Sequence, residues 1–191
     1  MKTYTTAIRL LLVMTLLTGL AYPLLITGIA QIIFPFKANG SLVERNGKVV
    51  GSALIGQSFD DNKYFTSRPS AIKYNPLPSG ASNLGPTNAE MKALFNKRIK
   101  AFLEYNNVDK NAAFPSEMAF ASASGLDPHI SLRSALLQVP RVASSRLLDS
   151  TRIKALYQLV NRMEEPRQIG FLGEPRINVL LLNLEMDKKF N

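Results

Sequence analysis

The stretch LLLVMTLLTGLAYPLLITGIAQIIFPF, which runs from Leu10 to Phe36, decides the organisation of this chain. It contains no charged residue, although 19% of the whole sequence is charged. As an α-helix it would be about 40 Å long at ~1.5 Å per residue, which exceeds the ~30 Å hydrocarbon core of a bilayer. The stretch therefore predicts a transmembrane helix over residues 10–36.

The residues that flank this stretch predict its orientation. Lys2 and Arg9 precede it with no acidic residue among them, so the positive-inside rule places residues 1–9 in the cytoplasm and residues 37–191 on the outer side of the membrane. A cleaved signal peptide, with a small-residue cleavage site at Gly28–Ala30, is the alternative. Because the apolar core of a signal peptide usually has only ~7–15 residues, we favour an uncleaved anchor.

Small and polar residues recur at every fourth position of the predicted span. Four-residue steps keep them on one slowly drifting stripe of the helix: Thr15, Gly19, Pro23, Thr27 and Gln31. Small residues allow close helix approach in lipid, and Thr or Gln can hydrogen-bond across a helix pair. Pro23 should also bend the helix. We predict that this stripe contacts other membrane helices, with a lone anchor that merely tolerates these residues as the alternative.

The outer segment, residues 37–191, is basic. It carries 21 basic and all 14 acidic residues, a formal charge of +7. The basic residues are scattered, and the short cluster Lys97–Lys100 lies on a predicted helix, where a solvated face is the simpler interpretation. A domain on the outer side also has no access to nucleic acid. With no Cys and one His, the sequence excludes a disulfide framework and a Cys nucleophile, and it predicts no metal site.

The outer segment is predicted to fold as one α/β (α+β) domain with a small sheet. Asn46-Gly47, between apolar residues, predicts a hairpin because both residues accept the positive φ of a type I′ turn. Further strands are predicted over Ser52–Ile55 and Glu117–Ala121. The almost continuously apolar run Arg176–Leu184 predicts a central strand buried on both faces.

Helices and one long loop occupy the rest of this domain. Residues 57–88 are rich in Pro, Gly and Asn but also contain aromatic residues, which predicts an ordered, functional loop rather than a linker. Three helices follow, each with a polar N-cap: one from the capping box of Thr87 and Glu90 to Asn106, one from Ser131 to Gln138 with Pro140 interrupting it, and one from Asp149 or Ser150.

No group of residues in the sequence predicts catalysis. Ser124, Asp127 and His129 lie within six positions of one loop, where a positioned triad rarely forms, and no G-x-S-x-G motif is present. The loop Gly170–Pro175 has two glycines but lacks the Lys-Ser/Thr pair of a phosphate-binding loop. We therefore predict a non-catalytic protein.

Several motifs of the outer segment resemble those of one known family. They are GSALIGQ (51–57), YFTSRPSA (64–71), YNP (74–76), SGASNLGPTN (79–88), SGLDPHIS (124–131), QVPRVA (138–143) and GFLGEPRINV (170–179). Together they resemble the KdpC family, the C subunit of the bacterial Kdp potassium-transporting ATPase, over essentially the whole chain. Ala81 and Ala123 depart from the family pattern, which has Gly at these places.

The resemblance implies an accessory subunit of a high-affinity, ATP-driven potassium importer in the bacterial cytoplasmic membrane. Its partners would be a channel-like potassium-binding subunit, a P-type ATPase subunit and a small membrane subunit. Potassium and Mg-ATP would be handled by the complex, with no cofactor bound tightly to this chain. The family is also described as a catalytic chaperone that raises ATP affinity, which would make Gln138 a nucleotide-binding candidate.

The long loop and the Asp127 loop are the predicted contact surface for a partner subunit. Arg68, Asn75 and Asn83 could present donors or carbonyl oxygens, and Asp127 could fix the loop. Turn formation alone is the alternative, because Asn, Asp and Pro are the usual turn residues. A second functional hypothesis is a membrane-anchored regulatory protein that senses nucleotide or ions.

Overall fold

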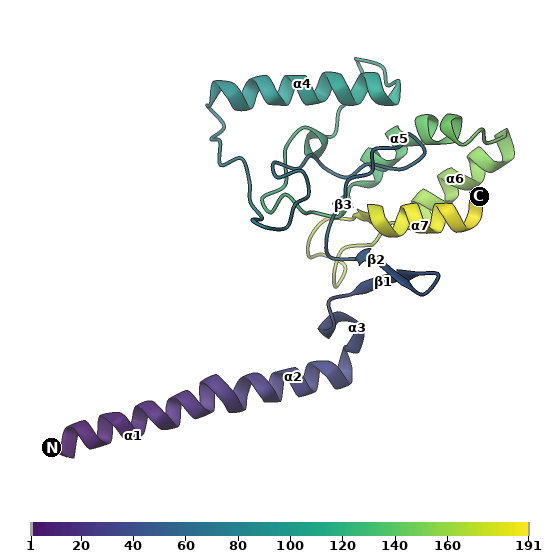
Figure 1. Cartoon of the computed structure of the whole chain (residues 1–191). Helices are drawn as coiled ribbons and strands as arrows, with labels where there is room; N and C mark the ends of the chain where they lie inside the picture. Colours follow the sequence, from purple (N-terminus) through teal and green to yellow (C-terminus); the bar gives the residue numbers. More distant parts are fainter. Residues whose placement is uncertain (1, 191) are drawn as a thin grey trace. The chain divides into compact units, whose positions relative to one another are not determined.

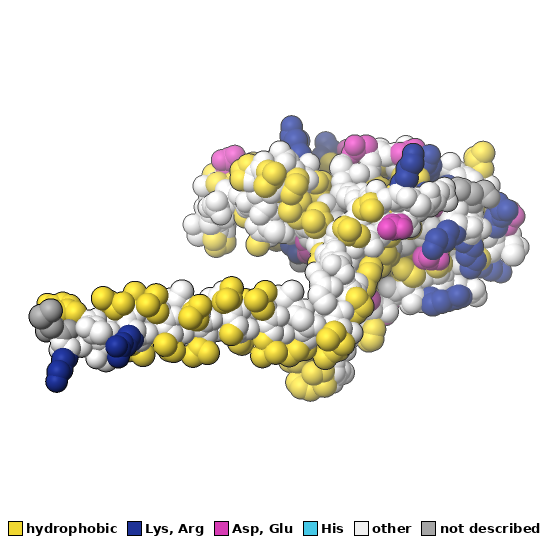
Figure 2. Space-filling view, turned by 60° about the horizontal axis from the view of Figure 1, so that its bottom comes forward, with side chains coloured by type: hydrophobic (Ala, Val, Ile, Leu, Met, Phe, Trp, Pro, Cys, Tyr) yellow, Lys and Arg dark blue, Asp and Glu magenta, His cyan; other side chains and the backbone are white. Residues whose placement is uncertain are grey.

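The computed structural model describes residues 2–190, which divide into two compact units, one ending at Ser52 and one beginning at Ala53. The first unit begins with a continuous helical rod (Figure 1) formed by α1 (Lys2–Leu16), the π-helical turn η1 (Leu17–Ala21) and α2 (Tyr22–Ile33). Its 32 residues are long and apolar enough to span a membrane, and none of its side chains is buried. Hydrophobic side chains cover the rod, with Lys and Arg near its N-terminal end (Figure 2). The predicted apolar helix is confirmed, although it begins before Leu10 and ends before Phe36.

The π-helical turn η1 lies directly before Pro23. Pro23 lacks the N–H that would bond to the Gly19 carbonyl, and its ring crowds that carbonyl. The chain widens here, and the Tyr22 N–H donates to the Leu17 carbonyl five residues back. The predicted effect of Pro23 on the helix thus takes the form of a π-turn, which is a common site of helix kinks.

A short helix and a hairpin complete the first unit. After α3 (Pro35–Ala38), strands β1 (Leu42–Arg45) and β2 (Lys48–Ser52) pair antiparallel. Asn46 and Gly47 both have positive φ, at 52° and 72°, as the predicted hairpin turn requires. The prediction of a strand over Ser52–Ile55 is wrong, because β2 ends at Ser52 and the chain then turns.

The second unit is mainly helical. It contains α4 (Ala89–Asn106), the 3₁₀ turn η2 (Ser116–Met118), α5 (Leu132–Ser145), α6 (Ser150–Arg162) and α7 (Val179–Phe190). Strands β3 (His129–Ile130) and β4 (Ile177–Asn178) form a two-residue antiparallel pair. α5 packs on α6 and α6 on α7 (Figure 1), and their apolar faces make the core, which includes Val139, Val142, Leu156, Val160, Leu182 and Met186. The mixed fold with small sheets is as predicted.

The prediction of a central strand over Arg176–Leu184 is wrong. Arg176 forms an isolated bridge, Ile177 and Asn178 pair as a strand, and residues 179–184 are the N-terminal half of α7. The Asn178 side chain accepts a hydrogen bond from the Leu181 N–H at 3.1 Å, as a helix cap does. A continuous apolar run is compatible with a buried helix as well as with a buried strand, and here the helix is the element that the core surrounds.

Three smaller predictions are corrected. The expected strand Glu117–Ala121 lies at a 3₁₀ turn. Pro140 does not interrupt α5, which continues to Ser145, because a single exposed Pro removes only one intrahelical bond. Asn88, not Thr87, caps α4, since its side chain accepts from the Glu90 and Met91 amides. Ser131 and Asp149 cap α5 and α6 as expected.

Candidate functional site

Two loops that are distant in sequence are joined into one surface of the second unit. Backbone hydrogen bonds link the Gly56 N–H to the Leu126 carbonyl at 2.7 Å and the Gly80 N–H to the Ser124 carbonyl at 3.1 Å. A Cβ at Gly56 would lie 2.6 Å from the Asp127 carbonyl oxygen, so only Gly permits this approach. The loop 57–88 is therefore ordered and held against residues 122–128.

Arg68 and Asp127, two of the predicted contact residues, meet at this junction. Arg68 Nη1 lies 3.0 Å from Asp127 Oδ2, and the His129 N–H donates to Asp127 Oδ1 at 2.9 Å. Burial alone would raise the pKa of Asp127, but hydrogen bonds from His129 and Arg68 outweigh it and lower that pKa below its usual value. The carboxylate is thus held charged and ties Arg68, on the long loop, to the loop that contains Asp127.

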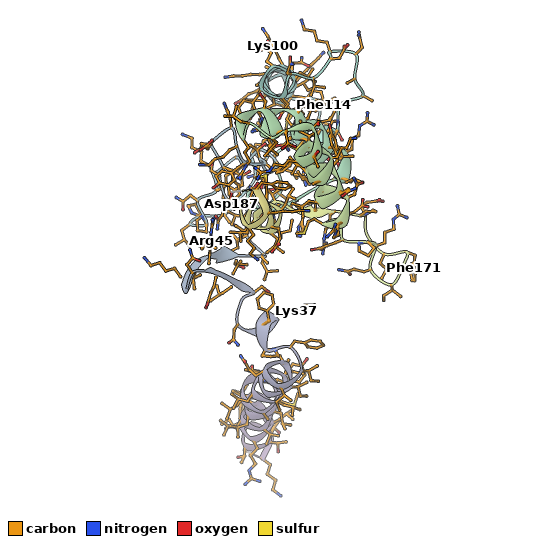
Figure 3. All side chains as sticks on the ribbon, turned by 90° about the vertical axis from the view of Figure 1, so that its right-hand side faces the viewer. Lys37, Arg45, Lys100, Phe114, Phe171 and Asp187 are labelled. Atoms are coloured by element: carbon orange, nitrogen blue, oxygen red, sulfur yellow. The ribbon has the colours of Figure 1, made fainter. Side chains whose placement is uncertain are left out.

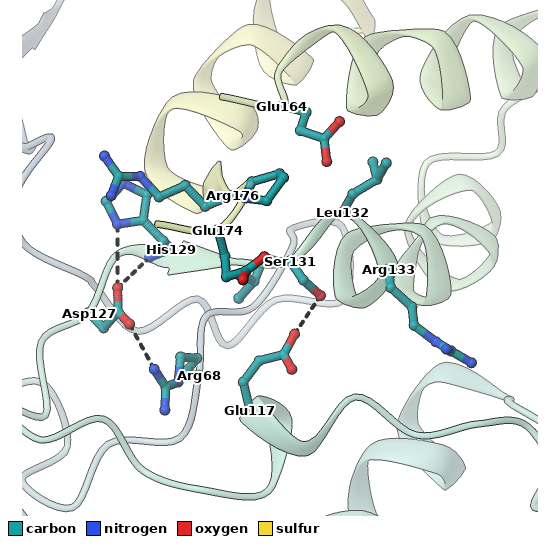
Figure 4. Close-up of a pocket in the computed structure, with 12 residues that line it drawn as sticks. Arg68, Glu117, Asp127, His129, Ser131, Leu132, Arg133, Glu164, Glu174 and Arg176 are labelled. Atoms are coloured by element: carbon teal, nitrogen blue, oxygen red, sulfur yellow. Dashed lines mark hydrogen bonds and ion pairs between the residues drawn. The ribbon is translucent and has the colours of Figure 1, made fainter. Parts of the chain in front are cut away.

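A cavity of about 680 Å³, lined mainly by charged and polar residues, opens beside this ion pair (Figure 4). On one wall, Glu117 Oε1 accepts hydrogen bonds from the hydroxyls of Ser131 and Ser134. Burial would raise the pKa of Glu117, but these hydrogen bonds lower it overall. Glu164 and Arg176 lie on the other wall. Within residues 2–190, no three His, Asp or Glu side chains gather closely enough to hold a metal ion.

Asn75 and Asn83 do not reach this cavity. Both are exposed, Asn75 Oδ1 accepts from the Leu77 N–H at 3.1 Å, and Asn83 has a φ of 54°. These are the roles of turn residues. The structure thus brings Arg68 and Asp127 together and leaves Asn75 and Asn83 on the surface of the same loop.

Gln138, the nucleotide-binding candidate, is completely buried. Its Oε1 accepts from the Thr66 N–H at 2.8 Å and from Arg141 Nη2 at 3.0 Å. Its Nε2 donates to the Thr66 carbonyl at 3.1 Å. Both ends of the amide therefore hold the loop 57–88 to α5. Nucleotide binding by Gln138 stays a prediction, and one that would require breaking these bonds.

Arg141 belongs to the same buried network, and the sequence analysis did not single it out. Its guanidinium donates to the Asn62 and Tyr64 carbonyls, to Asn106 Oδ1 and to Gln138 Oε1. All four acceptors are uncharged, and burial lowers the pKa of Arg141. The Gln138-x-x-Arg141 spacing places both side chains on one helix face, which is the signal that sequence reasoning missed.

The predicted stripe of small and polar residues in the candidate transmembrane helix is exposed. Thr15, Pro23 and Thr27 lie on the surface of the rod, and Gly19 falls within η1. Gln31 exchanges two hydrogen bonds of 3.2 Å with the side chain of Asn39. This pairing satisfies the amide within the chain, so Gln31 does not depend on a partner helix for its hydrogen bonds.

One membrane-type helix followed by a compact mixed domain defines a single-pass membrane protein. The family model "K+-transporting ATPase, c chain" (KdpC) matches residues 4–188. The KdpC subunit of the potassium-transporting ATPase of Rhodospirillum rubrum is 49% identical over 192 residues, covering 100% of this chain and 97% of the relative. That of Bradyrhizobium diazoefficiens is 49% identical, covering 95% of this chain and 94% of the relative. The chain therefore belongs to the KdpC family, subunits of the potassium-transporting ATPase.

Proposed function

We propose that this chain is a non-catalytic accessory subunit that stabilises the potassium-transporting complex. Its partners would be a channel-like potassium-binding subunit, a P-type ATPase subunit that hydrolyses ATP and a small membrane subunit. The observation that carries the proposal is the joined loop surface, in which the long loop 57–88 is fixed by the Arg68–Asp127 ion pair and by the buried Gln138 amide. A loop ordered before binding loses little conformational entropy when a partner docks on it.

The span supports the same proposal. The rod from Lys2 to Ile33 presents small and polar side chains at every fourth position and buries none of them within the chain. Small residues let a neighbouring membrane helix approach closely. We propose that the N-terminus lies in the cytoplasm and the second unit on the outer side, because Lys2 and Arg9 precede the apolar run.

An effect of this subunit on ATP affinity would then be indirect. An outer domain has no access to cytoplasmic ATP, and the Gln138 side chain is fully enclosed. We propose that any chaperone-like increase in ATP affinity is transmitted through the partner subunits. Binding of a labelled ATP analogue to the full chain alone should be undetectable, while the same analogue binds the complete complex.

The deciding experiment is potassium-stimulated ATPase activity of the purified complex with and without this chain, after gel filtration has shown which subunits remain together. Loss of assembly without the chain would identify an assembly subunit. An intact complex with lower activity or potassium affinity would give the chain a part in the transport cycle. An intact complex with unchanged activity would contradict the proposal.

A regulatory binding protein is the second candidate, favoured by the cavity beside Arg68 and Asp127. It predicts saturable binding of a nucleotide or ion to the full chain in detergent, measured by calorimetry. An Arg68→Gln variant should weaken that binding, while Arg152→Gln, on the exposed surface of α6, should leave it unchanged.

A further inference from the structure

A narrow hairpin-like loop connects α6 to β4. Isolated bridges pair Glu165 with Arg176 and Gln168 with Leu172. Ile169, Gly170 and Gly173 all have positive φ, and the chain reverses within residues 169–171, which the Gln168–Leu172 bridge closes. Residues 169–172 form the end of this loop and are called the tip.

The tip exposes three large apolar side chains. Ile169 is 82% exposed, Phe171 69% and Leu172 47%. Figure 3 shows Phe171 on a loop that projects from the helices of its unit. Aromatic and aliphatic side chains on a protruding, ordered loop are typical anchors of protein interfaces, where they fill pockets on the partner.

The two segments that lead into and out of the tip, residues 165–168 and 173–176, are called the stem, and two ion pairs link them. Arg167 Nη2 lies 2.8 Å from Glu174 Oε2, and Arg176 Nε lies 3.1 Å from Glu165 Oε2. These exposed pairs add little stability, but they neutralise the stem. A membrane surface is normally recognised by several unpaired basic residues, so the paired charges favour a protein partner over anionic lipid.

We propose that the tip inserts Ile169 and Phe171 into an apolar pocket on the outer face of a partner subunit. This inference rests on the proposed function, because it assigns the anchor of the assembly surface. The stem residues Glu174 and Arg176 line the same cavity as Arg68 and Asp127 (Figure 4). The stem therefore borders the predicted contact surface and the tip extends from this stem, so one partner can contact both.

The first test compares tip variants with a matched control in the whole complex. Leu147, between α5 and α6, is 92% exposed and has a φ of 53°, close to the 54° of Ile169. The double variant Ile169→Ser and Phe171→Ser should weaken retention of this chain by roughly tenfold or more as detergent is increased, the scale of losing an interface hot spot. Leu147→Ser should be retained like the unmodified chain. Equal retention of both variants would overturn the proposal.

A second test identifies what the tip touches, independently of any effect on stability. A photoreactive benzophenone side chain replaces Phe171 in the purified complex, with a second preparation carrying it in place of Leu147. The proposal requires a cross-link from position 171 to an outer loop of a partner subunit, located by mass spectrometry, and none to that loop from position 147. A lipid adduct, or no adduct, from position 171 overturns it.

The two proposals can fail separately. If the complex assembles and works without the chain, the proposed function fails as well. If the complex needs the chain but tolerates the tip variants, only this inference fails.

Discussion

The side chain of Arg141 joins three separate segments of the second unit. It joins the loop at Asn62 and Tyr64 to Asn106 at the end of α4 and to Gln138 on α5. Removing it would leave the buried Asn106 Oδ1 and the part-buried Tyr64 carbonyl without this donor, and each unsatisfied buried group costs about 1–3 kcal/mol. Gln138 Oε1 would keep its hydrogen bonds from Thr66.

Arg141→Met should therefore lower the free energy of unfolding by about 2–4 kcal/mol. Denaturant unfolding of the full chain in detergent, followed by the signal of the second unit, measures the change. Arg152→Met is the matched control, because Arg152 is exposed on α6, and it should change stability by less than about 0.5 kcal/mol. Similar effects of both substitutions would contradict the role given to Arg141.

Asp127 predicts a dependence of stability on pH. Its pKa is lowered in the folded chain from an ordinary value of 3.8, so its contribution is fully present above that ordinary value and is lost as pH falls through the lower, folded pKa. Asp127→Asn should be less stable than the unmodified chain near neutral pH, and the difference should shrink on acidification to about pH 3. Unfolding midpoints across this range measure it, and a constant difference would show that charge plays no part.

Sequence reasoning named Arg68 and Asp127 as candidate contact residues, from loop composition and family motifs. The structure pairs these two side chains with each other, and their contact with a partner stays a prediction. Glu117 was not identified, because its hydroxyl partners Ser131 and Ser134 lie 14 and 17 residues further along the sequence. Only the tertiary fold brings them together. The interior role of Gln138 depends in the same way on Thr66, which comes from a distant loop.

Among the elements, α6 offers the clearest test of local sequence signals. Asp149 Oδ1 accepts from the Thr151 and Arg152 amides at 2.9 and 2.8 Å, which satisfies two N–H groups that the helix leaves free. Asp149→Ala should reduce the free energy of unfolding by about 1 kcal/mol. Ser150→Ala, one position later and exposed, should be nearly neutral in the same thermal unfolding experiment.

The elements also show where sequence patterns stop being informative. Caps and turn residues act locally, so the Asn46-Gly47 hairpin and the starts of α5 and α6 could be predicted. Local sequence does not determine whether a largely buried segment forms a helix or a strand. Residues 179–184 are helical because α6 and the core surround them, and their buried Asn183 bonds both polar atoms to Phe65 across the fold.

At the scale of the whole molecule, the proposed function gives the membrane span two roles that can be tested separately: it anchors the chain, and it contacts the partner subunits. Replacing residues 10–33 by an uninterrupted Leu-rich span of the same length should keep the chain in the membrane but weaken its co-purification with the partner subunits, because the small-residue stripe is lost. Membrane fractionation and pull-down through a tagged partner measure the two effects. Co-purification at the original level would show that the span is only an anchor and that the outer unit supplies the contacts.

Because the hydrogen-bond partners of Arg141 are uncharged, we expect these hydrogen bonds to depend little on pH and salt concentration. Peptide carbonyls and side-chain amides do not take up protons in the range where carboxylates do, and short buried contacts are screened little by dissolved ions. In the proposed orientation the second unit faces the medium, where it would meet changing acidity and osmotic conditions. The hydrogen bonds of Arg141 should hold through such changes, so that the loop at Asn62 and Tyr64 stays attached to α4 and α5 in acidic or saline media even while exposed ion pairs such as Arg167–Glu174 loosen.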